Sequence, residues 1–358
     1  MLIMGIESSC DETSVSVIEE KMNSFFIKSN IIASQIEVHK LYGGVVPEIA
    51  SRAHIEAISK ITYEALNKAG VKINDIDLIA VTANPGLIGA LLVGVNFAKA
   101  LAYANSIPLV AVDHMKGHVG ASYLTGGKIP KAPFIALVVS GGHTAIYRIE
   151  NHFDYELVGT TRDDAAGEAF DKVGRILGIP YPAGAEFDRM ARRGFEKLTG
   201  RKENFFDGFD KVLKTRLSDI KLPSPAIADG SLDFSFSGLK TAAINIMHKY
   251  EARHEELEKE SFAAAYTYQV VSAIENKLST ALDRYGAKTV VLAGGVAANS
   301  HLRERVIHTA KAHGAELFLP PPSLCGDNGA MIAVEGYFAY MHGERADLTL
   351  NASALDGI

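Results

Sequence analysis

Two histidines four residues apart are the side chains whose type and spacing first suggest metal chemistry. His114 and His118 follow the apolar segment Ile107–Val112. On a helix, residues i and i+4 share one face, so both imidazoles can reach a single cation. Met115 stands where a zincin protease carries its general-base glutamate, which disfavours a protease of that class. Histidine pairs at this spacing more often have a structural role, so a metal site needs a third ligand.

A carboxylate that could complete such a site lies near the C-terminal end of the chain. Asp327 stands in the segment Leu324–Met331, a loop that opens into a helix of small residues. Two histidines and one carboxylate form a metal site that leaves coordination positions open for a substrate. The alternative is that Asp327 caps the helix that begins there. Both roles fit the sequence.

Two glycine-rich turns each follow an apolar strand. One is Ser140–Thr144, with the sequence Ser-Gly-Gly-His-Thr, and the other is Gly294–Asn299. Glycine lets the backbone approach a phosphate closely and permits a positive φ. Neither turn has the Walker spacing or the dinucleotide-binding fingerprint. Two related turns therefore predict a nucleotide in a cleft between two halves of the molecule.

Acidic residues offer further candidate contacts. Asp164, Glu168 and Asp171 are predicted at positions i, i+4 and i+7 of one helix, where like charges repel, so a binding role is favoured over a surface role. Asp171 or Asp188 could accept hydrogen bonds from a ribose. Glu12, in the first predicted hairpin turn, is a candidate acid, base or orienting group. An exposed turn residue is the alternative for Glu12, and ordinary surface acids are the alternative for the two aspartates.

The elements that must position these residues occur as two copies. Apolar segments flank a polar turn in residues 2–18 and again in residues 134–149, a pattern that predicts two β-hairpins. A strand, a glycine-containing loop and a helix follow at 76–103 and again at 288–313. That arrangement presents backbone N–H groups to an anion. We therefore predict an α/β fold made by internal duplication.

Helical and charged segments lie between the copied elements. Pro47–Ala69 and Ser261–Tyr285 carry apolar residues at helical spacing and are predicted to be packing helices. Gly194–Pro225 is richer in charge and is predicted to be an insertion or a mobile segment. A solvated surface is favoured for this segment over RNA binding.

Composition excludes several classes of protein. The chain has 358 residues, 47% of them hydrophobic, with 36 basic and 42 acidic side chains and a net charge of −6. These values predict about two globular domains and argue against a basic coat for non-specific nucleic-acid binding, although not against a local patch. The longest uncharged apolar stretch with helical character, residues 86–98, is shorter than the ~20 residues of a membrane span. Two cysteines and no positively charged leader predict a reduced, cytoplasmic protein.

Seven sequence blocks together carry a family resemblance over nearly the whole chain. They are, in order, Gly5–Thr13, Tyr42–Glu48, His114–His118, Val139–Thr144, Ala165–Lys172, Phe236–Thr241 and Cys325–Met331. In this combination they resemble the TsaD family, also called Gcp and formerly described as O-sialoglycoprotein endopeptidase. That family makes the threonylcarbamoyl modification of adenosine 37 in tRNA. One departure is Tyr181–Asp188, where Ala183 and Ala185 interrupt the family's usual Gly-Gly-Pro.

The resemblance implies a fold and a set of site residues. The fold is of the ASKHA type (actin, sugar kinase, Hsp70), with two ribonuclease-H-like halves around a nucleotide cleft. Residues 1–131 and 330–358 would form the first lobe, and 132–329 the second, with an inserted helical segment near 190–225. The matching metal ligands, for Fe²⁺ or Zn²⁺, are His114, His118 and Asp327. The residues matched to an adenine nucleotide, either threonylcarbamoyl-AMP or ATP/ADP, are Val138, Val139, Ser140, Gly141, Gly142, Asp171, Gly184, Asp188 and Asn299.

The resemblance also implies an activity and partners. The activity is transfer of the threonylcarbamoyl group from threonylcarbamoyl-AMP to N6 of adenosine 37 in tRNAs that read codons beginning with A, which forms t6A and releases AMP. Glu12 is the candidate catalytic side chain, and Ser140, Gly141 and Gly142 would supply backbone donors near the phosphate. Expected partners are tRNA, a TsaB-like inactive paralogue, a TsaE-like ATPase and a TsaC-type enzyme that supplies the adenylate, with no membrane involved. A metalloprotease (glycoprotease) and an ATP-binding scaffold are the alternatives.

Overall fold

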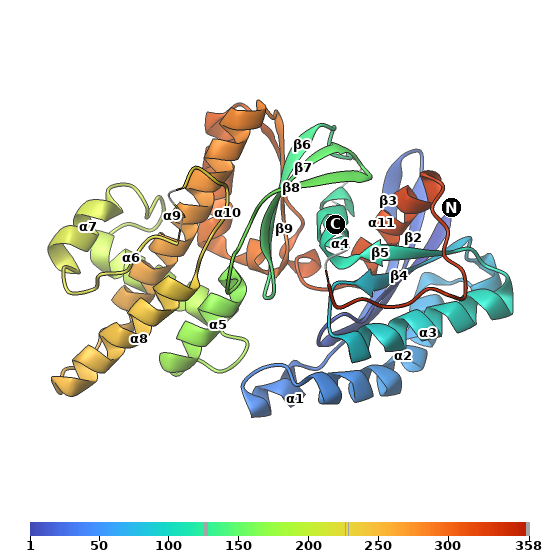
Figure 1. Cartoon of the computed structure of the whole chain (residues 1–358), viewed down its shortest axis with the longest axis horizontal. Helices are drawn as coiled ribbons and strands as arrows, with labels where there is room; N and C mark the ends of the chain where they lie inside the picture. The colour runs from blue at the N-terminus through green and yellow to red at the C-terminus, as the bar shows by residue number, and fades with distance from the viewer. Residues whose placement is uncertain (125–127, 226, 228, 356–358) are drawn as a thin grey trace.

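Each half of the chain folds around a five-stranded mixed sheet (Figure 1). The computed structural model describes residues 1–124, 128–225, 227 and 229–355. The first sheet has the strand order β3-β2-β1-β4-β5 and consists of β1 (Leu2–Glu7), β2 (Glu12–Lys21), β3 (Ser24–Ser34), β4 (Leu78–Asn84) and β5 (Leu109–Asp113). The second has the order β10-β9-β6-β7-β8 and consists of β6 (Phe134–Val139), β7 (Thr144–Asn151), β8 (Asp154–Thr160), β9 (Thr289–Ala293) and β10 (Glu316–Phe318).

The two sheets have the same topology. In each sheet the first three strands pair antiparallel, and the last two run parallel to the first strand. The predicted duplication and both predicted hairpins are therefore confirmed. The sequence patterns do not predict β3, β8 or β10. The first two are partly exposed edge strands, and β10 has only three residues, so none of them carries a strong apolar pattern.

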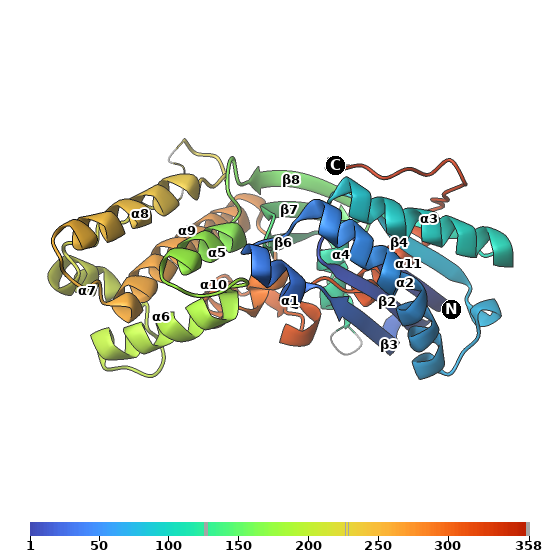
Figure 2. The same ribbon diagram turned by 90° about the horizontal axis from the view of Figure 1, so that it is seen from below.

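Helices α2 (Pro47–Ala69) and α3 (Ile88–Asn105) cover the outer face of the first sheet (Figure 2). The α2 helix begins with a proline, whose fixed φ suits the first turn, and ends at Gly70, which has a φ of +71°. The small residues of α3 allow close packing, because a Cβ built on Gly94 would lie 2.4 Å from the Ser8 hydroxyl oxygen. This contact holds α3 against the turn between β1 and β2.

By length and composition alone α3 could cross a membrane, although the apolar helices of protein cores pass the same test. The helix continues past Lys99, where the uncharged stretch in the sequence stops, to Asn105. One side of it, including Ala90, Val95 and Ala98, is buried against the first sheet. These are the contacts of a core helix.

Six longer helices build the outer part of the second lobe (Figure 2). They are α5 (Ala166–Ile176), α6 (Gly184–Thr199), α7 (Phe209–Arg216), α8 (Ser237–Ala252), α9 (Lys259–Tyr285) and α10 (Ser300–Ala312). The segment 194–225, for which an insertion or a mobile region was one expectation, contains the end of α6 and all of α7. It is packed, because Phe195, Phe205 and Phe209 are buried in the core of this lobe.

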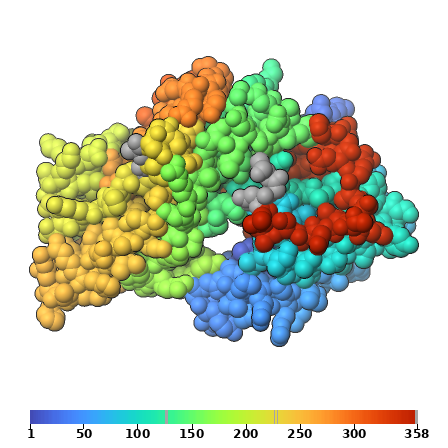
Figure 3. All heavy atoms as spheres, viewed as in Figure 1, coloured from blue at the N-terminus to red at the C-terminus, as the bar shows by residue number. Residues whose placement is uncertain are grey.

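The chain crosses between the lobes twice, and the two crossings pack together. The first runs through α4 (His114–Ala121) into β6, and the second runs from β10 into α11 (Gly329–Met341), which packs against α4 and the first sheet. Alternate side chains of β6 face two cores: Ala136 and Val138 share one with α4 and α11, whereas Leu137 faces the helices of the second lobe. Figure 3 shows an opening between the lobes.

Short elements complete the fold. They are α1 (Ile36–His39) and the 3₁₀ turns η1 (Lys40–Tyr42), η2 (Ile73–Asp75), η3 (Ser122–Leu124), η4 (Gly295–Ala298) and η5 (Pro322–Leu324). The expected lobe limits, 1–131 with 330–358 and 132–329, stay predictions. Their residues 125–127 and 356–358 lie outside the described part of the chain.

Candidate active site between the lobes

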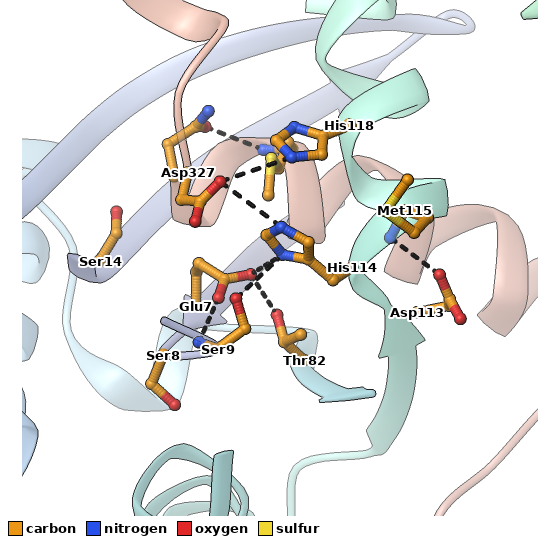
Figure 4. Close-up of polar contacts among 12 residues, drawn as sticks. Glu7, Ser8, Ser9, Ser14, Thr82, Asp113, His114, Met115, His118 and Asp327 are labelled. Atoms are coloured by element: carbon orange, nitrogen blue, oxygen red, sulfur yellow. Dashed lines mark hydrogen bonds and ion pairs between the residues drawn. The ribbon is translucent and has the colours of Figure 1, made fainter. Parts of the chain in front are cut away.

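The two crossings bring His114, His118 and Asp327 together (Figure 4). The Asp327 Oδ1 atom lies 3.5 Å from the Nε2 atom of each histidine. One ligand atom from each residue can be chosen so that all three lie within 4.8 Å of one another. Residues more than 200 positions apart in the sequence therefore form one compact set of two nitrogens and one carboxylate, the arrangement that the sequence predicts.

Local sequence explains how each ligand reaches its place. The Asp113 side chain caps α4 by accepting hydrogen bonds from the backbone N–H groups of Met115 (2.8 Å) and Lys116 (3.2 Å). Between the histidines, Gly117 lets α4 approach α11, since a Cβ there would lie 2.6 Å from Ile332. The cap of α11 is Asn328, which accepts from the Met331 N–H at 3.1 Å.

The alternative role for Asp327 is therefore wrong, because the neighbouring asparagine already caps the helix. The Asp327 side chain instead faces the histidines, and 19% of its surface remains exposed. A carboxylate in this position can bind a cation and leave room for a further ligand.

His118 provides the test of whether a metal fits. Its side chain is buried, and neither ring nitrogen has a hydrogen-bond partner among the residues that the structure describes. A buried polar group without a partner is costly, and a cation bound at Nε2 would satisfy that nitrogen. Burial also holds the pKa of His118 well below its ordinary value, which keeps the ring in the neutral form that binds metals. The donor set suits Fe²⁺ or Zn²⁺.

His114 carries the proton that a metal would displace. Burial alone would lower its pKa, but the charges of Asp327 and Glu7 raise it to about 10. Burial raises the pKa of Asp327 to about 6, against the attraction of His114. Metal binding at this site is therefore coupled to release of a proton.

Glu7 is a residue of the site that the sequence analysis misses. It ends β1, is fully buried, and its Oε2 atom lies 3.0 Å from His114 Nδ1. Because a carboxylate only accepts, Nδ1 carries the hydrogen and Nε2 is left to face Asp327. Thr82 Oγ (2.6 Å) and the Ser9 N–H (2.5 Å) also donate to Glu7. A carboxylate at the end of an apolar strand, directly before Ser-Ser-Cys, is the signal that could have identified it.

These contacts determine the charge of Glu7. Burial would raise the pKa of this carboxyl group, but the neighbouring His114 and the hydrogen bonds lower it to about 2. Glu7 is therefore ionised at neutral pH, and it supports His114 in the way that a carboxylate supports a metal-binding histidine.

Glu12 lies at the start of β2, in the same turn. It is partly buried, and Ser34 Oγ donates to its Oε1 atom at 3.3 Å. Burial, then the charges of Asp327 and Asp11, raise the pKa of Glu12 to about 9. Across the opening, the Tyr181 hydroxyl donates to Asp11 Oδ2 at 3.4 Å. The first turn thus faces the second lobe and holds a protonated acid near Asp327.

The glycine turns of the second lobe pack against each other. Gly294 has a φ of +90°, and a Cβ there would lie 2.4 Å from the Val139 carbonyl oxygen. On the other side, a Cβ on Gly167, in the first turn of α5, would lie 2.5 Å from the Ser140 carbonyl oxygen. Two glycines without side-chain conflicts, Gly141 and Gly142, are exposed at the tip.

The Ser140 residue of the β6–β7 turn makes hydrogen bonds within the turn itself. The Ser140 N–H donates to the His143 carbonyl at 2.8 Å, and Ser140 Oγ accepts from the His143 N–H at 3.1 Å. The Ser140 amide is therefore already engaged, and its expected contact with a phosphate stays a prediction. The side chains of Val138 and Val139 are fully buried, so only their backbone could face a ligand.

The remaining predicted nucleotide contacts are hydrogen-bonded to the starts of α6 and α10 or lie there. Asp171 Oδ1 accepts from the Ala183 N–H (2.7 Å), directly before Gly184, the exposed first residue of α6. Asp188 Oδ1 accepts from the N–H (3.2 Å) and hydroxyl (3.1 Å) of Ser300. Asn299 caps α10 by accepting from the Leu302 N–H at 2.9 Å. One oxygen of each side chain thus has a structural contact, and the remaining polar atom is a carboxylate oxygen in Asp171 and Asp188 and the amide nitrogen in Asn299.

The predicted repulsion among the acids of α5 is wrong. Asp164 precedes the helix, which begins at Ala166. Its carboxylate pairs with Lys172 (2.9 Å) and with Lys240 (2.5 Å), and Lys172 also pairs with Glu168 (2.6 Å). Two lysines therefore neutralise Asp164 and Glu168, and the repulsion argument does not support a binding role.

Comparisons of the sequence agree on one family. A family model described as tRNA N6-adenosine threonylcarbamoyltransferase matches residues 26–334. A curated relative of that name from Bacillus thuringiensis is 48% identical over 353 residues, which cover 98% of this chain and 95% of the relative. Another, from Clostridium beijerinckii, is 43% identical over 351 residues and covers 98% and 96%.

Solved structures share the fold at low sequence identity. Component A of (R)-2-hydroxyglutaryl-CoA dehydratase from Acidaminococcus fermentans has a TM-score of 0.51 and 15% identity, covering 96% of this chain and 98% of that chain. Full-length HypF in its phosphate- and nucleotide-bound form has a TM-score of 0.50 and 14% identity, covering 96% and 47%. These likenesses confirm the predicted ASKHA-type fold.

Proposed function

Because the chain belongs to the TsaD family of tRNA N6-adenosine threonylcarbamoyltransferases, we propose that it transfers the threonylcarbamoyl group of threonylcarbamoyl-AMP to N6 of adenosine 37. The substrates are tRNAs that read codons beginning with A, and the products are t6A and AMP. The observation that supports this chemistry most directly is the buried His118, whose ring nitrogens have no hydrogen-bond partner among the described residues, beside His114 and Asp327.

In the proposed reaction, the N6 amine attacks the carbamoyl carbon of the mixed anhydride. A C–N bond forms, the C–O bond to the phosphate breaks, its electron pair leaves with AMP, and the amine loses a proton. AMP is a good leaving group, so positioning and charge stabilisation contribute more than a strong base. The exposed backbone at Gly141 and Gly142 would let a phosphate approach closely.

His114, His118 and Asp327 would hold the metal. A bound divalent cation such as Fe²⁺ or Zn²⁺ supplies Lewis-acid stabilisation of charge on substrate oxygens. Glu7 keeps a hydrogen on Nδ1 of His114, so that Nε2 stays directed to the centre. The Asp327 side chain keeps 19% of its surface exposed, which leaves room for a substrate oxygen beside the cation.

Glu12 would act as an acid. Its raised pKa of about 9 leaves the carboxyl group protonated at neutral pH, which suits it to donate a hydrogen bond to a substrate oxygen. Glu12→Gln keeps a donor at this place, so we expect it to retain at least about a tenth of the transfer rate, whereas Glu12→Ala loses about 100-fold or more. If both variants are equally inactive in single-turnover transfer, the ionised carboxylate is required and the acid role is wrong.

The deciding experiment is reconstitution. The full chain is mixed with metal, a tRNA transcript, TsaB-like and TsaE-like proteins and synthetic threonylcarbamoyl-AMP, and the nucleosides are analysed by mass. We expect t6A only in transcripts that carry adenosine at position 37. Release of AMP without a modified nucleoside would contradict the proposal. A TsaC-type enzyme would supply the adenylate in the cytoplasm, where we propose the protein acts.

The two alternatives give different results in the same preparation. Peptide cleavage that depends on added metal and stops with a chelator would support the protease. Loss of modification in His114→Ala and His118→Ala variants that still bind nucleotide would support transfer over an ATP-binding scaffold.

A further inference from the structure

The outer end of the second lobe carries lysines that have no acidic partner. On α6, the cations Arg189, Arg193 and Lys197 each form an ion pair within 3.3 Å. On α7, on α8 and in the segment that follows α7, the exposed ammonium groups have no carboxylate within 4.0 Å among the described residues. These unpaired lysines are Lys211, Lys214, Lys221 and Lys249.

Two of these lysines line one groove. A hollow of about 420 Å³ lies between the segment after α7 and the side of α8, with Lys221 and Lys249 in its lining. Ser218 and Asn245 add polar groups, and Asp219 is the one acidic side chain of the lining. The groove is therefore a cationic, hydrogen-bonding surface on a chain whose net charge is −6.

The groove has a firm base. Ile246 of α8 forms part of its lining and is 7% exposed, and Ile220, next to Lys221, is 8% exposed. Both belong to the core of the second lobe, as does Phe209 at the start of α7. The lysines are therefore attached to packed elements, which lowers the entropy lost when they bind a ligand.

We propose that this groove, called here the α7–α8 groove, binds the phosphate backbone of the tRNA substrate. This inference rests on the proposed function, which supplies an RNA ligand. An otherwise acidic protein repels a polyanion except where cations are concentrated, so the unpaired lysines would orient the approach.

The chemistry of the groove favours phosphates over bases. No aromatic side chain belongs to its lining, so it offers no surface on which bases could stack. Figure 1 shows α7 and α8 at the end of the molecule away from α4, which carries the metal-binding histidines. The groove would hold the body of a long substrate while its adenosine enters the opening between the lobes.

Charge reversal tests the proposal. The double variant Lys221→Glu/Lys249→Glu is compared with Lys28→Glu/Lys60→Glu, which makes the same change in net charge at exposed lysines of the first lobe. Binding of a fluorescent tRNA transcript is measured by anisotropy at several salt concentrations. Metal affinity and AMP binding of each variant, and its unfolding midpoint, show whether the rest of the protein is intact.

At about 0.1 M salt each lost phosphate contact lowers affinity by about five- to tenfold, so the groove variant should bind tRNA about 25- to 100-fold more weakly. The slope of log affinity against log salt should become shallower by about two. The control should change affinity by less than about threefold. Equal weakening in both variants, no weakening in the groove variant, or no binding by the unaltered chain would overturn the proposal.

The proposed function can fail separately from the groove. Unaltered protein that binds the transcript through the groove but transfers nothing to it would contradict the proposed function alone. Normal transfer together with unchanged binding by the groove variant would contradict the groove alone.

Discussion

The turn between β1 and β2 and the turn between β6 and β7 occupy equivalent places in two copies of one fold, yet they are built differently. Glu7 and Val139 both end the first strand of their sheets. The first is a buried carboxylate that contacts His114, a candidate metal ligand, and the second is a buried apolar side chain followed by exposed glycines. The first turn acts through side chains, and the second offers its backbone.

The difference shows how a duplicated fold can build an asymmetric site. The common scaffold places each turn after the first strand of its sheet, while the residues within the turns are free to diverge. The candidate metal ligands also occupy equivalent places in the two copies. They lie on the two segments that follow β5 and β10 and cross to the other lobe.

The largest effect should come from removing the carboxylate that joins the two crossings. Asp327→Ala should lower metal affinity by more than about 100-fold, beyond what the loss of a supporting residue causes, and should abolish transfer. Chelator competition measures the affinity. The neighbouring Asn328→Asp should keep the cap of α11 and bind metal normally, and if it loses as much affinity, the assignment of Asp327 is wrong.

Removal of the Glu7 charge beside the first turn should have the next largest effect. Glu7→Gln keeps the shape of the residue but removes its charge, so metal affinity should fall by about 10- to 100-fold. Val139→Ala at the equivalent place should cost about 1–3 kcal/mol of unfolding free energy and leave metal affinity unchanged. Unchanged metal affinity in Glu7→Gln would show that Glu7 does not support His114 as a metal ligand.

One glycine of the second turn, Gly142, and one of the turn after β9, Gly294, should separate binding from stability. Gly142→Ala meets no neighbouring atom, so its unfolding free energy should change by less than about 0.5 kcal/mol, while AMP should bind about tenfold more weakly because of the added methyl group. Gly294→Ala, with its positive φ, should instead cost about 1–3 kcal/mol of stability. Normal AMP binding by Gly142→Ala would argue against close backbone approach.

A second buried carboxyl group, Glu335, provides a contrast to Glu7, because its pKa is shifted in the opposite direction. Glu335 accepts from the Tyr155 hydroxyl at 3.1 Å, and burial raises its pKa to about 8. The folded state therefore keeps a proton that the unfolded state loses above its ordinary pKa, so stability should fall as pH rises from about 5 to 8. The slope is at most about 1.4 kcal/mol per pH unit.

The lowered pKa of Glu7 works in the opposite direction, since its stabilisation is lost only as pH falls toward about 2. Glu335→Gln should flatten the decline between pH 5 and 8 in denaturant titrations. An unchanged slope in that variant would show that Glu335 titrates normally.

Sequence patterns predicted the copied elements because period-two and helical patterns are local. The α2 helix has the predicted limits, Pro47 and Ala69, which a proline and a following glycine mark. The spacing of Asp164, Glu168 and Asp171 favours a helix that includes Asp164. Spacing alone cannot reveal the lysine partners of Asp164, because Lys172 and Lys240 come from two different helices. The edge strands β3 and β8 lack a strong apolar pattern because part of each strand is exposed.

The sequence by itself determined the duplicated α/β scaffold and the residue types of the site, since burial patterns, glycines and histidine spacing are written along the chain. Only the tertiary structure decided that Asp327 meets the histidines while Asn328 caps the helix, that Glu7 supports His114, and that the Ser140 amide is already engaged. The physical reason is that these contacts join segments distant in sequence, and their partners are fixed only when the two lobes pack around the crossings.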